Sequence, residues 1–406
     1  MVRRANIYIK WIFSYLFFLF FIYSTDSFYA STNIKTTFFV FSKYLIVFLG
    51  CVGFLKTLKS SYFWTNFLYI FTLVSVICMG GYSGGIIFKF LLLFAGYCFV
   101  CFYGWNEFKD KYVNIITFIA AYSFICFLFA SLLVNCRLFP IVENVNNYFY
   151  RDLFLTHFSL MPDYQSVVCV WRNYGPFWEP GVFQIYLVLA IIFVLFGYEK
   201  INKLKILVLT ATLFSTFSTA AFITFFVVLL AFFLKKGYVK EKACIFLFVL
   251  FGLIILLSNK IFSNMIFDKL SARNDSSSSR LESLLVGLRI SLRNPLGTGP
   301  YLFLEKMKDY GYVGSDGNTN GFIQHFGIMG WTFGVWYVYR LYNFVKCFNT
   351  KNIMVTYLIL LAIVLELCNE PLFYSLPFST ILFYKPNMRK MYLNTKKLIK
   401  FKGTVI

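Results

Sequence analysis

The sequence has few charged residues for its length. Asp, Glu, Lys and Arg make up 14% of the 406 residues, whereas hydrophobic residues make up 59%. A soluble protein of this size needs far more polar side chains to cover its surface. The composition therefore excludes an ordinary soluble protein and indicates a chain that crosses a membrane many times.

Motifs of several enzyme classes are also missing from the sequence. The chain has no GxxxxGK[ST] phosphate-binding loop, no GxSxG hydrolase motif and no HExxH zinc motif. The segments that we assign to the cytoplasm are too short for a nucleotide-binding domain. We therefore expect no ATP hydrolysis and no nucleotide-sugar donor. A substrate that carries its own activated bond would need neither ATP nor a nucleotide sugar.

The apolar runs predict an all-α polytopic membrane protein with about 12 transmembrane helices in a single membrane domain, residues 1–406. The first run lacks a small-residue cleavage site, so we interpret it as an uncleaved helix. The predicted spans are 11–24, 37–55, 62–79, 86–103, 115–135, 181–197, 205–217, 220–234, 244–258, 321–338, 353–368 and 372–385.

The positions of Lys and Arg place both termini in the cytoplasm. Arg3 and Arg4 lie at the start of the chain, and the tail 385–406 is rich in Lys and Arg. This topology accounts for much of the net charge of +21, so we expect lipid headgroups rather than nucleic acid as partners. Two long polar loops, 136–180 and 259–320, then lie together on the outer face.

The first outer loop ends in Trp171–Gly181, a segment of aromatic, Gly and Pro residues directly before a predicted span. Such residues predict a rigid, non-helical turn at headgroup depth. The turn presents Arg172 and Glu179. One interpretation is an aromatic anchor with a local salt bridge. The other is that Arg172 binds phosphate through its planar fork while Glu179 accepts a proton.

The second outer loop contains an S-x-x-E capping box, Ser279–Glu282, which predicts a helix that ends near Arg293. Arg280 and Arg289 flank an apolar stripe, so the helix can lie on the membrane or on the transmembrane bundle. The helix dipole does not stabilise a cation in the first turn. A phosphate partner would therefore explain the position of Arg280. The alternative is a surface arginine beside the capping Glu282. The stripe consists of Leu281, Leu284, Leu285, Leu288 and Leu292.

Polar residues also mark the entrance to the predicted span 321–338. Asn318 and Asn320 can form hydrogen bonds with sugar hydroxyls. His325, one of two histidines, suggests an acid or base, although a lone His at the start of a span is often a structural residue. Glu366 lies near the outer end of the predicted span 353–368, and functional and structural roles are equally consistent with its position.

The order of these motifs resembles that of a known group of membrane enzymes. The motifs are Arg172-x-x-Gly175-x-x-x-Glu179-Pro180-Gly181, Ser218-Thr219, Arg280, Asn294-Pro295-Leu296-Gly297-x-Gly299, and Asn320-Gly321 with Gly327. With the helix count, they resemble the Wzy-type O-antigen or capsule repeat-unit polymerases, whose superfamily includes the O-antigen ligases. Ligase-like members usually have a His beside the Asn before the tenth span, whereas Thr319 stands there in this chain.

The resemblance implies a metal-independent glycosyltransferase of GT-C-like architecture, without a cofactor, in the bacterial cytoplasmic (inner) membrane. Its donor would be an oligosaccharide on undecaprenyl pyrophosphate, and its acceptor a sugar hydroxyl of the next lipid-linked repeat unit. The product would be O-antigen or capsular polysaccharide, made at the outer, periplasmic face. Membrane lipids and a chain-length regulator protein are further expected partners, and nucleic acid is not.

The resemblance also implies roles for individual residues. Arginines would stabilise the departing pyrophosphate, and Glu179 or His325 would remove the acceptor proton. The predicted binding residues are Arg172 and Arg280, with Arg289, Asn318 and Asn320 in secondary roles. Two alternatives stay open. An O-antigen ligase would use the same donor with a lipid A core acceptor, and a lipid-linked oligosaccharide flippase would have a similar number of spans.

Overall fold

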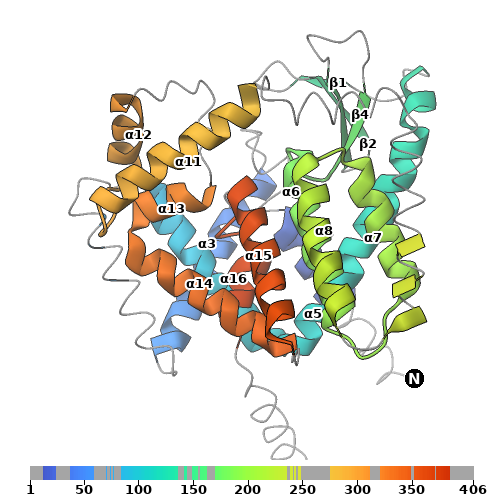
Figure 1. Ribbon diagram of the computed structural model, residues 1–406, viewed down its shortest axis with the longest axis horizontal. Helices are drawn as coiled ribbons and strands as arrows, with labels where there is room; N and C mark the ends of the chain where they lie inside the picture. Colours follow the sequence, from blue (N-terminus) through green and yellow to red (C-terminus); the bar gives the residue numbers. More distant parts are fainter. Residues whose placement is uncertain are drawn as a thin grey trace, which may run out of the picture.

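The computed structural model of the protein is mostly helical (Figure 1). It describes residues 12–23, 37–58, 70, 74, 76, 84–135, 141–143, 149–153, 156–161, 170–235, 238–240, 242–243, 246–247, 275–310, 321–348, 352–370 and 372–384. The named helices are α3 (Thr37–Leu58), α5 (Gly84–Asn135), α6 (Pro180–Phe196), α7 (Lys203–Ser215), α8 (Thr219–Leu234), α11 (Asp275–Arg293), α12 (Pro300–Asp309), α13 (Gly321–Met329), α14 (Trp331–Val345), α15 (Ile353–Asn369) and α16 (Leu376–Leu382). Most of the predicted spans 62–79 and 244–258 lies outside the described residues.

Apolar helices form the body of the molecule. In the described part of the chain, one helix, Leu91–Phe129 within α5, is long and apolar enough to cross a membrane. Shorter apolar helices include Ile12–Tyr23, α6, α8 and α15. Nearly every side chain of α6 is buried, so this helix lies at the centre of the bundle. The predicted class, a mostly helical membrane protein, is confirmed, and the number of spans stays a prediction.

The long element α5 consists of two helices that meet at Gly104, where the backbone adopts φ +68 and ψ 166. This break separates the two predicted spans 86–103 and 115–135. A side chain at Gly104 would meet no atom within 4 Å, so the glycine is needed for its backbone conformation rather than for space.

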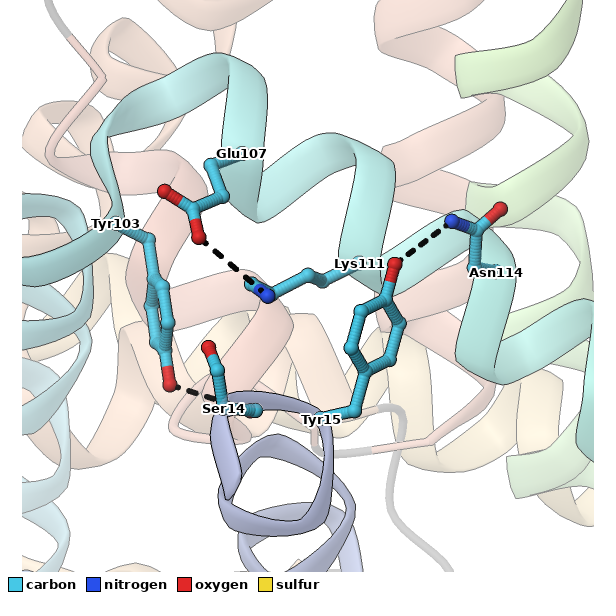
Figure 2. Close-up of polar contacts among 6 residues, drawn as sticks. All are labelled: Ser14, Tyr15, Tyr103, Glu107, Lys111 and Asn114. Carbon is cyan, nitrogen blue, oxygen red and sulfur yellow. Dashed lines mark hydrogen bonds and ion pairs between the residues drawn. The ribbon is translucent and has the colours of Figure 1, made fainter. Parts of the chain in front are cut away.

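Polar contacts on both sides of Gly104 attach the helix Ile12–Tyr23 to α5 (Figure 2). Lys111 is buried, forms an ion pair with Glu107 at 3.4 Å, and its Nζ lies 4.3 Å from the centre of the Tyr15 ring. The Tyr15 hydroxyl accepts a hydrogen bond from Asn114 at 2.9 Å. A buried lysine therefore has a carboxylate and an aromatic ring as partners, which offsets the cost of removing it from water.

Lysines also cap helix ends in the turns that the sequence assigns to the cytoplasm. Lys109 Nζ donates to the Gly197 carbonyl at 2.7 Å, and Lys235 Nζ donates to the Leu195 carbonyl at 3.0 Å. Both carbonyls belong to the C-terminal end of α6, where cations interact favourably with the helix dipole. Part of the positive charge of these turns thus stabilises helix ends.

The first outer loop contains an antiparallel sheet that the sequence did not predict. Its strands, β1 (Ile141–Glu143), β2 (Phe149–Leu153), β3 (Thr156–Met161) and β4 (Val170–Gly175), pair in the order β1-β2-β3-β4. Strands of three to six residues are too short to show a clear alternation of polar and apolar residues. The expected non-helical segment before α6 therefore begins as strand β4.

The second outer loop contains α11 and the unpredicted α12. Helix α11 ends at Arg293 as predicted, but it begins at Asp275, so the predicted cap Ser279 lies inside the helix. The serine run 276–279 therefore extends the helix instead of preceding it. In Figure 1 the sheet and the pair α11–α12 lie at the same, upper end of the helices.

Two predicted spans near the C-terminus are wrong in extent. The predicted helix 321–338 is interrupted at Gly330, which has φ +85 and separates α13 from α14. The predicted helix 372–385 contains α16, which has 7 residues and is too short to cross a bilayer. Apolar composition alone indicated both spans, and it carries no information on where the backbone turns.

Candidate functional site

Arg172 connects the sheet to the helical bundle. It lies in β4, has 9% of its surface exposed, and its Nε donates a hydrogen bond to the Thr216 carbonyl at 3.1 Å. Thr216 begins the tight turn between α7 and α8, in which Phe217 adopts φ +48. The guanidinium is therefore held beside the turn from which α8 starts.

The first turn of α8 adds favourable electrostatics to this position. Ser218 is the N-cap residue, and its side chain makes no capping hydrogen bond. The first N–H groups of a helix have no partner within the helix and attract anions, and α8 has 16 residues. A buried arginine next to a helix N-terminus is chemically suited to a phosphate group.

Asn173 fixes the position of β4 against the bundle. Its side chain is fully buried and donates to Ser215 Oγ at 3.0 Å and to Ser123 Oγ at 3.3 Å. Its Oδ1 accepts from the Gly175 N–H at 2.9 Å. Gly175 has φ +55, and a Cβ there would lie 2.8 Å from the Phe183 ring. Asn173 and Gly175 thus set the backbone path that places Arg172.

Two carboxylates lie beside the start of α6. Glu179 is exposed and directly precedes α6. A Cβ at Gly181 would lie 3.1 Å from Glu370 Oε1 and 3.8 Å from Glu179 Oε2, so Gly181 leaves room for both carboxylates. An exposed carboxylate at a helix start can accept a proton from a substrate hydroxyl. Glu370, which ends α15, is the neighbour that the sequence alone did not place there.

Glu366 lies one helical turn from Glu370 and is buried, with 2% of its surface exposed. It accepts hydrogen bonds from the Thr224 hydroxyl of α8 and from Gln184 Nε2 of α6, the latter at 3.3 Å. Glu366 therefore links α6, α8 and α15, which supports a structural role. Gln184 and Thr224 were not predicted, and their only sequence signal is a polar residue within an apolar helix.

His325 lies in α13 within a cluster of aromatic rings. Its ring stacks on Phe373, with the ring centres 4.1 Å apart and the planes at 14°, and the Tyr374 ring lies at 5.0 Å. His325 has 8% of its surface exposed. Phe373 and Tyr374 belong to the connection from α15 to α16, so His325 packs against this connection.

The Asn294–Pro300 segment attaches the second outer loop to the end of α13. The N–H groups of Thr298 and Gly299 donate to the carbonyls of Gly327 and Ile328 at 2.9 Å and 3.1 Å. Gly297 adopts φ +86, and a Cβ there would lie 2.5 Å from the Ile328 carbonyl oxygen. The glycines of this motif therefore permit two backbone segments to pair closely.

The predicted Arg289 of α11 contacts a different part of the molecule from Arg172. Arg289 is exposed, and its guanidinium lies 5.5 Å from the centre of the Tyr310 ring beside α12. Arg280 lies in the N-terminal part of α11. Asn318 and Asn320 lie outside the described residues. The described contacts thus group Arg172, Glu179 and Glu370 around the start of α6 and α8, and Arg289 with α12.

Among the described residues, no three His, Cys, Asp or Glu side chains form a group that could hold a metal ion.

Residues 204–338 match the family model described as O-Antigen ligase. The match runs from α7 into α14 and includes the α7–α8 turn, α11 and the Asn294–Pro300 segment. No curated protein and no solved structure matches the chain. The match covers about a third of the chain, and this part of the protein is therefore similar to the O-antigen polymerase/ligase superfamily.

Proposed function

We propose that the protein polymerises lipid-linked glycan repeat units at the outer face of the bacterial cytoplasmic membrane. The observation that carries this proposal is the position of Arg172, buried beside the turn that starts α8. A guanidinium and a helix N-terminus together suit the pyrophosphate of an undecaprenyl-linked donor. The family match over the same turn supports this assignment.

In the proposed reaction, an acceptor hydroxyl attacks the anomeric carbon of the donor glycan. The new glycosidic bond forms as the bond between that carbon and the pyrophosphate oxygen breaks, so negative charge develops on the pyrophosphate. Arg172 stabilises this charge, and Arg280 is proposed to approach the same lipid-linked substrate from α11. Arg289 lies beside Tyr310 and α12, so we assign it to the lipid around the substrate rather than to the departing pyrophosphate. Asn318 and Asn320 are proposed to bind its sugars.

Glu179 is the proposed base that takes the proton from the acceptor hydroxyl. Its carboxylate is exposed and lies with that of Glu370 beside Gly181, at the end of the bundle that carries Arg172. His325 is a weaker candidate, because its ring is packed on Phe373 and its surface is mostly covered. Glu179 therefore has better access to a substrate hydroxyl than His325.

An O-antigen ligase is the second candidate function, and the description of the matching family favours it. The donor and the role of Arg172 would be the same, whereas the acceptor would be a lipid A core sugar. The two functions differ in what accumulates without the gene. Loss of a polymerase leaves glycolipid with a single repeat unit, and loss of a ligase leaves long chains on the lipid carrier.

The experiment is to replace Arg172 by Ala or Lys in cells that depend on this gene and to separate the surface polysaccharide on a gel. We expect both variants to lose long chains, since lysine lacks the planar fork that binds two phosphate oxygens. Arg340→Lys is a matched control, because Arg340 also donates to backbone carbonyls, those of Leu382 and Tyr384. Normal chain length in both Arg172 variants, at normal protein level, would refute the proposed role.

A further inference from the structure

Helix α11 packs on α12 and α13 through small residues and Ile290. Ser283, Gly287, Ile290 and Ser291 are buried. A Cβ at Gly287 would lie 2.9 Å from Ile323 Cγ2, so the glycine permits α11 to approach α13 closely. The sequence left open whether the apolar stripe lies on the membrane or on the bundle, and the contact with the bundle uses the opposite side.

Two leucines of α11 consequently point away from the protein, whereas Leu284 and Leu288 are half-buried. Leu285 is 57% exposed and Leu292 is 64% exposed. Around the end of α11 and in α12, Leu296, Tyr301 and Leu304 are also exposed, at 44%, 62% and 44%. Exposed leucines at a seven-residue spacing form an apolar face on a helix, and the described residues do not cover this face.

Cations lie next to this apolar face. Arg289 and Arg293 are both exposed, and their guanidinium groups lie 5.5 Å and 5.6 Å from the centre of the Tyr310 ring. Arg293 also donates to the Tyr310 hydroxyl at 2.5 Å. An apolar helix face with arginines along its edge is complementary to acyl chains below a layer of anionic headgroups.

The direction of α11 agrees with this partner. Figure 1 shows α11 inclined to α8 and α15 at the upper end of the helices, where it packs on α13 and α12. If α8 and α15 cross the bilayer, α11 lies close to the plane of its outer surface. A helix in that position has lipid beside its exposed face.

We propose that α11 is an interfacial helix that docks on the outer leaflet of the membrane. Leu285 and Leu292 insert at the level where headgroups meet acyl chains, and Arg289 and Arg293 bind the phosphates of anionic phospholipids. The helix then fixes the height of the second outer loop above the bilayer. The proposal does not depend on which acceptor the enzyme uses.

The test places a fluorescent amino acid at position 292 of the full-length protein in nanodiscs that contain phosphatidylglycerol and lipids brominated near the headgroup. Position 282 is the matched control, because Glu282 is exposed on the same helix but lies off the apolar stripe. We expect bromine quenching to be roughly several-fold stronger at 292 than at 282. The Arg289→Gln, Arg293→Gln double variant should reduce the quenching at 292, as should replacing phosphatidylglycerol by phosphatidylcholine.

Equal quenching at positions 292 and 282, in protein that unfolds at the temperature of the unlabelled chain, would overturn the proposal. A blue shift of the fluorescence emission at position 292 that increases with protein concentration, with or without brominated lipid, would also overturn the proposal. It would indicate contact between two copies of the chain. Quenching at 292 that is unaffected by lipid charge and by the arginine variant would overturn the assignment of anionic headgroups.

Discussion

Replacing Gly297 by alanine tests how firmly the second outer loop is attached to α13. Gly297 adopts φ +86, and a Cβ there would lie 2.5 Å from the Ile328 carbonyl oxygen and 2.8 Å from the Gly330 nitrogen. Both neighbours are backbone atoms, which cannot move aside as a side chain can. The alanine therefore has to separate the two segments.

The expected loss of stability has two parts. An alanine in this backbone region costs about 1–3 kcal/mol in strain. Separation of the segments also breaks the hydrogen bonds from Thr298 to Gly327 and from Gly299 to Ile328. Each contributes about 1 kcal/mol, so the close contact adds about 2 kcal/mol to the strain. The total is about 3–5 kcal/mol.

Gly104→Ala is the control that separates the cost of backbone strain from the cost of the close contact. Gly104 adopts φ +68, and a Cβ added there would have no atom within 4 Å. The apparent Tm of both purified variants should be measured at one scan rate. For a chain of 406 residues, the additional 2 kcal/mol corresponds to a Tm about 2–3 °C lower for Gly297→Ala than for Gly104→Ala. Equal Tm values would refute the close pairing of the Asn294–Pro300 segment with α13.

Two further substitutions test the surroundings of the site. Asn173→Ala removes the hydrogen bonds to Ser215, to Ser123 and from the Gly175 N–H, and we expect a loss of about 2–3 kcal/mol in the free energy of unfolding. The measurement is thermal unfolding beside the Ser215→Ala variant, which loses one of these three bonds. An Asn173→Ala protein no less stable than Ser215→Ala would contradict this. His325→Phe keeps the stacking on Phe373, so we expect normal protein level and normal polysaccharide chains on a gel. Loss of long chains at normal protein level would make His325, and not Glu179, the base.

The sequence was most informative where one backbone conformation is required. Gly175 and Gly297 belong to the motifs that carry the family resemblance, and both have positive φ and a close neighbour. The turn before α6 was predicted from its prolines and glycines. The predicted end of a helix near Arg293 and the predicted non-helical segment before α6 agree with the structure, because each constraint is local and lies in the residue itself.

The sequence was least informative where packing depends on distant residues. The leucines of α11 predicted an apolar face, but the contact with α13 is made by Gly287 and its small neighbours. In a membrane protein, close packing favours small residues, because leucines are equally well accommodated by lipid. Glu370 beside Gly181 is a second example, since the two residues lie far apart in the chain.

Arg172 joins the first outer loop to the segment that carries the family match. Arg172 lies before residue 204, whereas its partner Thr216 lies within the matched residues 204–338. A phosphate that binds this guanidinium would also lie close to the first N–H groups of α8, so substrate binding would couple β4 to the α7–α8 turn. Arg172→Ala removes the cation and the bond to the turn together. Arg172→Lys keeps the charge but loses both the planar fork and the Nε that donates to Thr216. Loss of long chains in the lysine variant at normal protein level would therefore indicate a role in phosphate recognition rather than in the fold.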